Sequence, residues 1–175
     1  MRRFVLSIDP GTTKSGVCLV RTDDMRPVWC AKLENASVRG AVVREMAAKG
    51  WSCNDLECVI ERMYNPYSAD SNVFLTCEWI GRFDVYMREI TGAVTKYVYR
   101  YEEYKDLCAN MYPRNDKGVR AALVDRFAYG QPNFGKGNST NRGWFYGFNA
   151  DVWSAYAIAV THIDMEALRE DSQGC

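Results

Sequence analysis

The stretch Arg3-Phe4-Val5-Leu6-Ser7-Ile8-Asp9-Pro10-Gly11 decides the expected fold, because it is an apolar strand that ends on an acid before a tight turn. A second apolar run, Glu57-Cys58-Val59-Ile60-Glu61, also ends on an acid, and Asp151 opens a helical run that continues to residue 162. A carboxylate at the end of a buried strand needs a counter-charge or a metal ion. Three such carboxylates at one point would suit Mg²⁺, which prefers oxygen ligands beside phosphates, so a phosphodiester is the expected substrate.

Each acid also has a local interpretation. Asp9 is a common type of turn residue before Pro-Gly, Glu61 fits an ion pair at a strand end, and Asp151 fits the favourable acidic position in the first turn of a helix. Taken singly, each local interpretation is at least as good as the catalytic one.

A resemblance favours the catalytic interpretation. The stretch Ile8-Asp9-Pro10-Gly11-Thr12-Thr13-Lys14-Ser15-Gly16 resembles the first strand and turn of RuvC-like Holliday-junction resolvases. Val59-Ile60-Glu61-Arg62-Met63-Tyr64 resembles their second acidic strand, and Ser68-Ala69-Asp70-Ser71 resembles the start of the helix that follows. Ala155-Tyr156-Ala157-Ile158-Ala159-Val160-Thr161-His162 resembles their final catalytic helix. The matches occur in the family's order and span nearly the whole chain.

The resemblance implies an RNase H-like α/β fold, with a mixed five-stranded sheet and helices on both faces, in a single nuclease domain over residues 1–175. It implies a two-metal hydrolysis with Mg²⁺, or alternatively Mn²⁺, in which Asp9 bridges both ions while Glu61 and Asp151 bind one each. The implied activity is the resolution of four-way DNA junctions in recombination and repair, leaving 5′-phosphate and 3′-hydroxyl ends. Two symmetric nicks imply a two-fold homodimer.

The chain departs from the family pattern at Ser154. Many relatives carry a second aspartate at this position, one helical turn after the position of Asp151. At about 100° per residue, the two side chains lie about 60° apart and can face the same site. A hydroxyl is a poorer Mg²⁺ ligand than a carboxylate. Three interpretations remain open: Ser154 holds a water beside the ion, Asp151 binds alone, or the site is weakened.

Several residues are candidate DNA contacts. Tyr64 stands three residues after Glu61, where RuvC-type relatives can carry an aromatic that inserts at the junction, although a tyrosine packed in a turn is nearly as good an interpretation. Lys117 resembles a basic residue before the family's penultimate helix. Lys136 and Arg142 lie in a glycine-rich loop, residues 130–147, of a kind that can mould to nucleic acid.

Charge and composition fit this interpretation. Residues 114–142 hold six basic and two acidic residues, a net charge of +4, while the remaining 16 basic and 20 acidic residues carry −4. Such a segment suits a polyanion, and an ordinary solvated surface is the alternative. The chain has no run of about 18 apolar residues and no signal-peptide pattern, so we expect a soluble protein of a bacterial or phage-infected cytoplasm. The seven scattered cysteines predict reduced thiols.

Periodicity and turn residues predict the order of the elements. We expect strands at 4–8, 16–20, 28–33, 58–61 and 95–101, and helices at 38–49, 71–91, 115–128 and 151–169, the last capped by Asn149 or Ala150. The single histidine, His162, lies about three turns from Asp151 and is expected to be a satisfied histidine. The dimer face is expected on the helix at 71–91, which carries more apolar residues than one core face needs: Val73, Phe74, Trp79, Ile80, Phe83 and Met87.

Three rival functions can be weighed, and the first of them does not fit the chain. The Asp-Pro-Gly-Thr-Thr turn is also similar to the phosphate-binding turn of sugar kinases and actin-like ATPases, but those proteins need two domains and a second such turn. The YqgF-type RNA-processing nucleases share the opening motif. A non-catalytic or weakly active branched-DNA-binding protein, or a capsid-associated one that kept the fold, is supported by Ser154 and opposed by the retention of all three acids.

Overall fold

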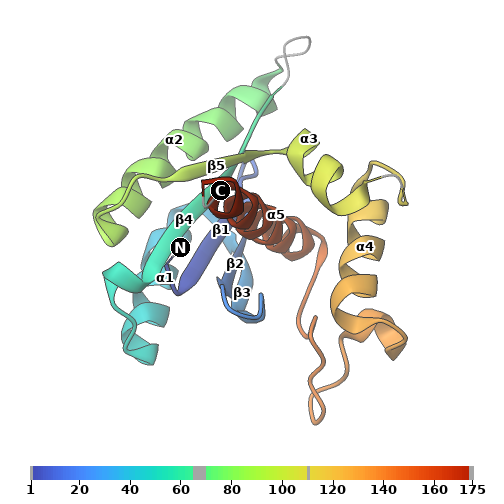
Figure 1. Cartoon of the computed structure of the whole chain (residues 1–175). Coiled ribbons are helices and arrows are strands. Elements are labelled where there is room, and N and C mark those ends of the chain that lie inside the picture. The colour runs from blue at the N-terminus through green and yellow to red at the C-terminus, as the bar shows by residue number, and fades with distance from the viewer. Residues whose placement is uncertain (1, 65–69, 110, 174–175) are drawn as a thin grey trace.

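A five-stranded sheet forms the centre of the computed structural model, which describes residues 2–64, 70–109 and 111–173 (Figure 1). The strand order is β3-β2-β1-β4-β5. The first three strands form an antiparallel meander, and β4 and β5 pair in parallel on the other side of β1. The strands are β1 (Phe4–Asp9), β2 (Lys14–Arg21), β3 (Pro27–Glu34), β4 (Leu56–Arg62) and β5 (Lys96–Tyr99).

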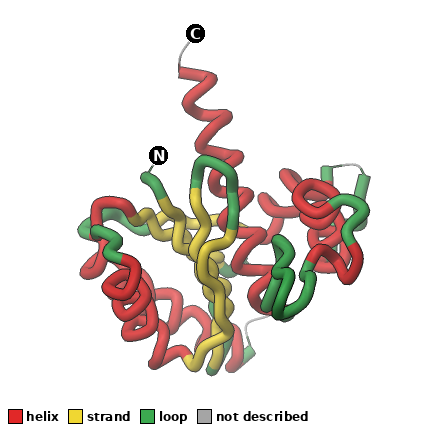
Figure 2. Tube along the Cα trace, turned by 90° about the horizontal axis from the view of Figure 1, so that it is seen from below, coloured by secondary structure: helices red, strands yellow, loops and turns green. Residues whose placement is uncertain are grey.

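Helices cover both faces of the sheet, as expected (Figure 1). Helices α1 and α2 lie on one face, while α4 and α5 lie on the other, with α5 directly against β1 and β2. The helices are α1 (Asn35–Lys49), α2 (Ser71–Thr91), α3 (Arg100–Glu103), α4 (Asp116–Ala128) and α5 (Ala150–Gln173). Figure 2 shows the C-terminal end of α5 extending beyond the sheet.

The two-residue period of the strands builds the two cores. On β1, Val5 faces the α5 layer, while Phe4, Leu6 and Ile8 face the α1–α2 layer. Along α5, the stretch 155–162 is buried throughout and rich in alanine, which lets the helix lie close to the sheet. The sequence pattern therefore positions α5, and with it Asp151, against the central strands.

Helix ends follow the expected capping residues. Asp70 accepts hydrogen bonds from the backbone N–H groups of Asn72 and Val73 and so starts α2, in agreement with the sequence expectation, although residues 68 and 69 lie outside the described residues. Asn149 accepts a bond from Val152 N–H at the start of α5. Gly50 ends α1 with a φ of 65°, a backbone conformation that favours glycine.

Three expectations need correction. The last strand stops at Tyr99, because Glu102 accepts a hydrogen bond from Tyr99 N–H at 2.8 Å and thereby starts α3 at Arg100. A π-helical turn, Tyr104–Cys108, follows directly. The loop expected at 130–147 contains a short helical turn, Pro132–Gly135, and its Phe145 is buried in the core beside α5.

The third correction concerns α2. Phe83 and Met87 are buried in the core and Trp79 and Ile80 pack partly against it, so these four residues cover the sheet instead of forming a dimer face. The exposed large apolar side chains on α2 are Phe74, Leu75 and Val85.

Other sequence expectations agree with the structure. His162 is buried, and its Nε2 lies 3.1 Å from Glu57 Oε1, so it is a satisfied histidine. The six cysteines in the described part of the chain are all free thiols. No helix among the described residues is long and apolar enough to cross a membrane.

Candidate active site

Asp9 and Glu61 meet because β1 and β4 are parallel neighbours. Their register places Ile8 beside Ile60, so the carboxyl ends of both strands, each carrying an acid, lie at the same edge of the sheet. The turn after Asp9 is fixed by Asn35, which donates to Gly11 C=O at 2.9 Å and accepts from Ser15 Oγ at 2.7 Å. Asp9 therefore sits on a rigid support.

Asp151 reaches the same edge through a close approach of α5 to β2. Gly16 is the partner of Asp9 in the β1–β2 ladder. A Cβ atom added to Gly16 would lie 2.1 Å from the carbonyl oxygen of Asp151, so only glycine allows the start of α5 to rest there. One residue on β2 thus links the positions of two of the three acids.

The carboxyl groups of Asp9 and Glu61 interact directly. Burial, together with repulsion from Glu61, raises the pKa of Asp9 well above its ordinary value, and Asp9 shares a hydrogen bond with Glu61. Burial also raises the pKa of Glu61, despite the neighbouring Arg100. Two carboxyl groups held this close and out of water share a proton unless a cation relieves their repulsion.

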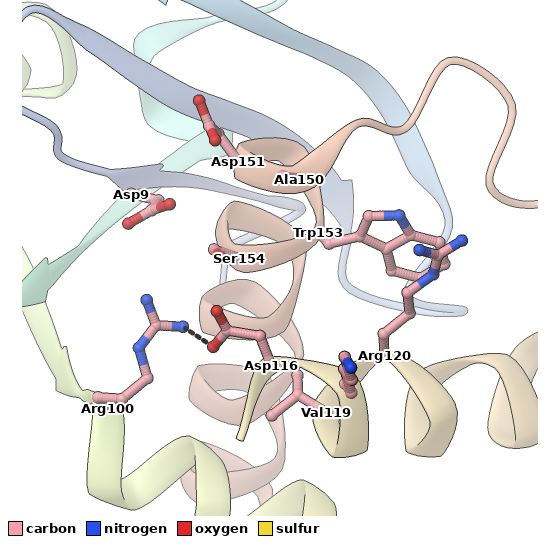
Figure 3. Close-up of a pocket in the computed structure, with 10 residues that line it drawn as sticks. Asp9, Arg100, Asp116, Val119, Arg120, Ala150, Asp151, Trp153 and Ser154 are labelled. Atoms are coloured by element: carbon pink, nitrogen blue, oxygen red, sulfur yellow. Dashed lines mark ion pairs between the residues drawn. The ribbon is translucent and has the colours of Figure 1, made fainter.

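Arg100, which the sequence analysis missed, supplies such a cation. Its Nε lies 2.9 Å from Glu61 Oε1 and its Nη2 lies 3.1 Å from Glu61 Oε2. Its Nη1 lies 3.4 Å from Glu103 Oε2 and 3.7 Å from Asp116 Oδ1, the latter contact drawn in Figure 3. The sequence signal for Arg100 is the Tyr-Arg-Tyr-Glu-Glu run at 99–103, which overlaps the end of the strand predicted at 95–101.

Lys32 is a second missed cation. It lies on β3 and forms an ion pair with Asp151. Its position across β2 from the start of α5 depends on the β2–β3 register, in which Gly16 pairs with Lys32. A cross-strand neighbour of this kind leaves no mark in the local sequence.

A cleft of about 370 Å³ contains four of the predicted site residues, namely Asp9, Lys117, Asp151 and Ser154 (Figure 3). Asp151 and Ser154 line it from α5, and Lys117 lines it from α4. Ser154 therefore shares the cleft with two of the acids, as its helical spacing from Asp151 predicted. Arg120 and Trp153 close the side of the cleft away from Asp9 (Figure 3).

The donor set fits a hard divalent cation in part. Asp9 and Glu61 offer adjoining carboxyl oxygens, the ligand type that Mg²⁺ and Mn²⁺ take. Within the described ranges, no three histidine, cysteine, aspartate or glutamate side chains lie close enough to enclose a metal ion. A three-carboxylate site therefore requires Asp151 to leave Lys32 and Glu61 to leave Arg100.

A second hollow, of about 510 Å³, opens on the other side of Asp9 and contains Tyr64. Tyr64 is 71% exposed. Its ring centroid lies 6.0 Å from that of Tyr99 and 6.2 Å from that of Tyr101, and the rings of Tyr99 and Tyr101 stack at 5.5 Å. Asp9 and Arg100 line both hollows, so this aromatic cluster adjoins the acids. The alternative, a Tyr64 packed in a turn, involves residues 65–67, which lie outside the described residues.

The two basic residues of the 130–147 loop lie apart from the acids. Lys136 Nζ donates to Phe148 C=O at 2.6 Å and so holds the loop against the core. Arg142 stacks over Tyr146 and lines a separate hollow with Arg26 and Trp144. Neither of them lines the cleft around Asp9.

Comparison with known proteins gives matches in structure only. No protein-family model matches the chain, and no curated protein matches it significantly by sequence. T. thermophilus RuvC in complex with a Holliday junction substrate has a TM-score of 0.68 and 15% sequence identity, with 95% of this chain and 96% of RuvC covered. A further structure of Thermus thermophilus RuvC gives a TM-score of 0.67 at 15% identity, covering 94% and 96%. The chain therefore has the RuvC fold, an RNase H-like arrangement of a mixed five-stranded sheet between helices.

Proposed function

We propose that this protein is a Mg²⁺-dependent endonuclease that resolves four-way or branched DNA junctions by paired nicks, acting as one nuclease domain. The observation that carries the proposal is the place of Asp9 in a RuvC-type fold, beside Glu61 at one sheet edge and in one cleft with Asp151. Divalent ions bound there would activate the attacking water and neutralise charge on the leaving oxygen. Asp9 has the central position, with Glu61 on one side and Asp151 on the other, which fits the bridging role implied by the family resemblance.

Ser154 fits a supporting role in this proposal. It lines the cleft with Asp9 and Asp151, and its hydroxyl can hold a water or a phosphate oxygen by a hydrogen bond. It supplies no negative charge, so the binding of a second divalent ion on that side of Asp9 would depend on Asp151 and on Asp116, the other acid that lines the cleft.

The DNA contacts in this proposal fall into two groups. Lys117 lines the cleft with Asp9 and Asp151, which supports a contact with a phosphate beside the acids. Tyr64, with Tyr99 and Tyr101 behind it, is placed to stack on an unpaired base at a junction, a contact worth about 1–3 kcal/mol per base. Lys136 and Arg142 are proposed contacts to a duplex arm.

A symmetric pair of nicks requires two active sites, so we propose a homodimer. Phe74 and Val85 are 61% and 52% exposed, and they lie on one face of α2 because 11 residues make about three turns. This face keeps Phe74 and the helix expected from the sequence, but it does not include the buried residues Phe83 and Met87. Measurement of the molar mass in solution for wild type and for a Phe74→Glu variant tests it.

A second candidate function is binding of branched DNA with little or no cutting. The observation that favours it is the occupation of two of the three acids by cations of the protein itself, Arg100 on Glu61 and Lys32 on Asp151. A single experiment separates the two functions: incubation of the protein with a labelled four-way junction or a matched linear duplex, in Mg²⁺ or in EDTA. Paired nicks in the junction that need Mg²⁺ support the nuclease, whereas binding without nicks at any Mg²⁺ concentration supports the second candidate.

A further inference from the structure

Arg100 is paired with Glu61, a carboxylate that would have to be free to bind a metal ion in the proposed nuclease. Its guanidinium uses both carboxylate oxygens of Glu61, with N–O distances of 2.9 and 3.1 Å. This two-pronged geometry is the strongest arrangement between an arginine and a carboxylate. A divalent ion that binds Glu61 needs at least one of the same oxygens, so Arg100 and the ion compete for one carboxylate.

Displacement from Glu61 would not free Arg100 from the cleft. Its third nitrogen, Nη1, already lies 3.4 Å from Glu103 Oε2 and 3.7 Å from Asp116 Oδ1. Glu103 is fully buried, and in the described part of the chain its Oε1 has no hydrogen-bond partner. Glu103 can therefore hold the guanidinium more fully once Glu61 is taken.

The position of Arg100 also suits contact with a phosphate. It lines the cleft with Asp151 and Lys117 as well as the hollow with Tyr64, so it lies between the acids and both DNA-facing groups. Its side chain is 32% exposed, which leaves N–H donors accessible from the cleft. An arginine fork matches phosphate as well as carboxylate geometry.

We propose that Arg100 is a phosphate-binding residue that rests on Glu61 until a divalent ion takes that carboxylate, and that it then turns to the DNA phosphate in the cleft. Metal binding and substrate binding are thereby linked through one side chain. The proposal rests on the proposed nuclease function, because it assigns the carboxylates to a divalent ion.

Replacement of Arg100 should change the affinity for divalent metal ions in one direction only. Loss of Arg100 removes a positive charge within a few ångströms of the ion and frees both oxygens of Glu61. Repulsion between a unit charge and a dication at such distances opposes metal binding even at a high effective dielectric constant, although screening reduces it. We expect the Kd for Mg²⁺ or Mn²⁺ to become tighter by about tenfold in Arg100→Gln. An arginine that served only to orient Glu61 for the metal would give the opposite sign.

The experiment is a titration with Mg²⁺ and with Mn²⁺ by calorimetry, without DNA, so that it does not depend on cutting. Arg100→Gln is compared with wild type and with Arg39→Gln, a control that removes an arginine paired at 2.8 Å with Glu89 between α1 and α2. Tighter metal binding in Arg100→Gln, with Arg39→Gln equal to wild type, supports the proposal. Unchanged, weaker or undetectable metal binding in Arg100→Gln overturns it.

Arg100→Lys keeps the test decisive if Arg100→Gln does not fold, as judged by circular dichroism. Lysine keeps the charge but loses the two-pronged contact with Glu61, so metal binding should tighten by a smaller factor, about two- to fivefold. Equal or weaker metal binding in a folded Arg100→Lys protein overturns the proposal.

A second arm measures junction affinity against salt, in Ca²⁺ and in EDTA. Arg100→Gln should flatten the log–log salt slope by about one unit in Ca²⁺ and leave it unchanged in EDTA, where Arg100 rests on Glu61. An equal effect in both conditions contradicts the linkage. A wild-type protein that binds metal in competition with Arg100 but never cuts a junction refutes the nuclease function while leaving this inference supported.

Discussion

Replacement of Gly16 by alanine should disturb the site without touching any acid. The added Cβ would lie 2.1 Å from Asp151 C=O and 2.6 Å from its carbon, whereas real Cβ atoms keep about 3.0 Å from such atoms. The start of α5 must therefore move from β2 by about 0.9 Å. A misplacement of about 1 Å in a catalytic constellation can cost about 100-fold in rate.

Two assays follow the effect of Gly16→Ala. The cleavage rate of a four-way junction at saturating Mg²⁺ should fall about 100-fold at a temperature where the protein is folded. Overpacking of this kind costs about 1–3 kcal/mol of unfolding free energy, and each kcal/mol lowers Tm by about 2–4 °C for a chain of this size. Junction binding in EDTA should change little, because the movement affects the acids and not the basic residues.

Gly40→Ala is the matched control. Gly40 lies within α1, and its added Cβ would meet only the flexible end of Arg44 at 3.3 Å. Alanine is the better helix residue by about 1 kcal/mol, so Tm should rise and cutting should stay at the wild-type level. Wild-type cutting and wild-type Tm in Gly16→Ala would refute the idea that this close approach positions Asp151.

Four further predictions concern single residues. Asp9→Asn should abolish cutting while junction affinity stays equal or increases, because a charge that repels phosphate is removed; undiminished cutting in a nuclease assay would reject the assignment of the site. Ser154→Asp should preserve or raise cutting at low Mg²⁺, since a carboxylate replaces a weak ligand; a large loss of activity in a normally folded protein would show that the hydroxyl acts in another way. Burial raises the pKa of Glu103 to about 8, so its protonated form stabilises the fold, and that contribution is lost as pH rises from about 4.5 to about 8. The free energy of unfolding in urea should therefore decline over this range by up to about 1.4 kcal/mol per pH unit, and Glu103→Gln should remove this decline. Parallel pH curves for the two proteins would contradict the shift. Lys117→Ala should flatten the salt dependence of junction affinity by about one log–log unit, whereas an unchanged slope would mean that Lys117 is an ordinary surface residue.

The sequence predicted the features that depend on neighbouring residues, namely the strands and the helix ends. Alternating apolar residues gave the strands, and Asp70, Asn149 and Gly50 marked helix ends because a cap or a left-handed residue acts on its own neighbours. The acids at strand ends predicted their meeting at one edge, since parallel neighbours end together. The partners of those acids were not predictable in this way.

Arg100 and Lys32 depend on pairing over long distances in the sequence. Arg100 lies 39 residues from Glu61 and meets it only because β5 pairs with β4 and stops at Tyr99. Lys32 meets Asp151 because the β2–β3 register places it beside Gly16. The surplus of apolar residues on α2 was misassigned for a similar reason, since the width of sheet that a helix covers cannot be known before the sheet is built.

The docking of α5 on β1 and β2 affects the order in which the protein can fold during its synthesis on the ribosome. All five strands are synthesised before α5, so the sheet face that carries Val5, Cys18 and Val20 stays uncovered until α5 emerges. Exposed apolar strands are the part of a growing chain most open to aggregation or chaperone binding. Asp151 arrives with α5, so Asp9, Glu61 and Asp151 come together only after α5 has docked on the sheet.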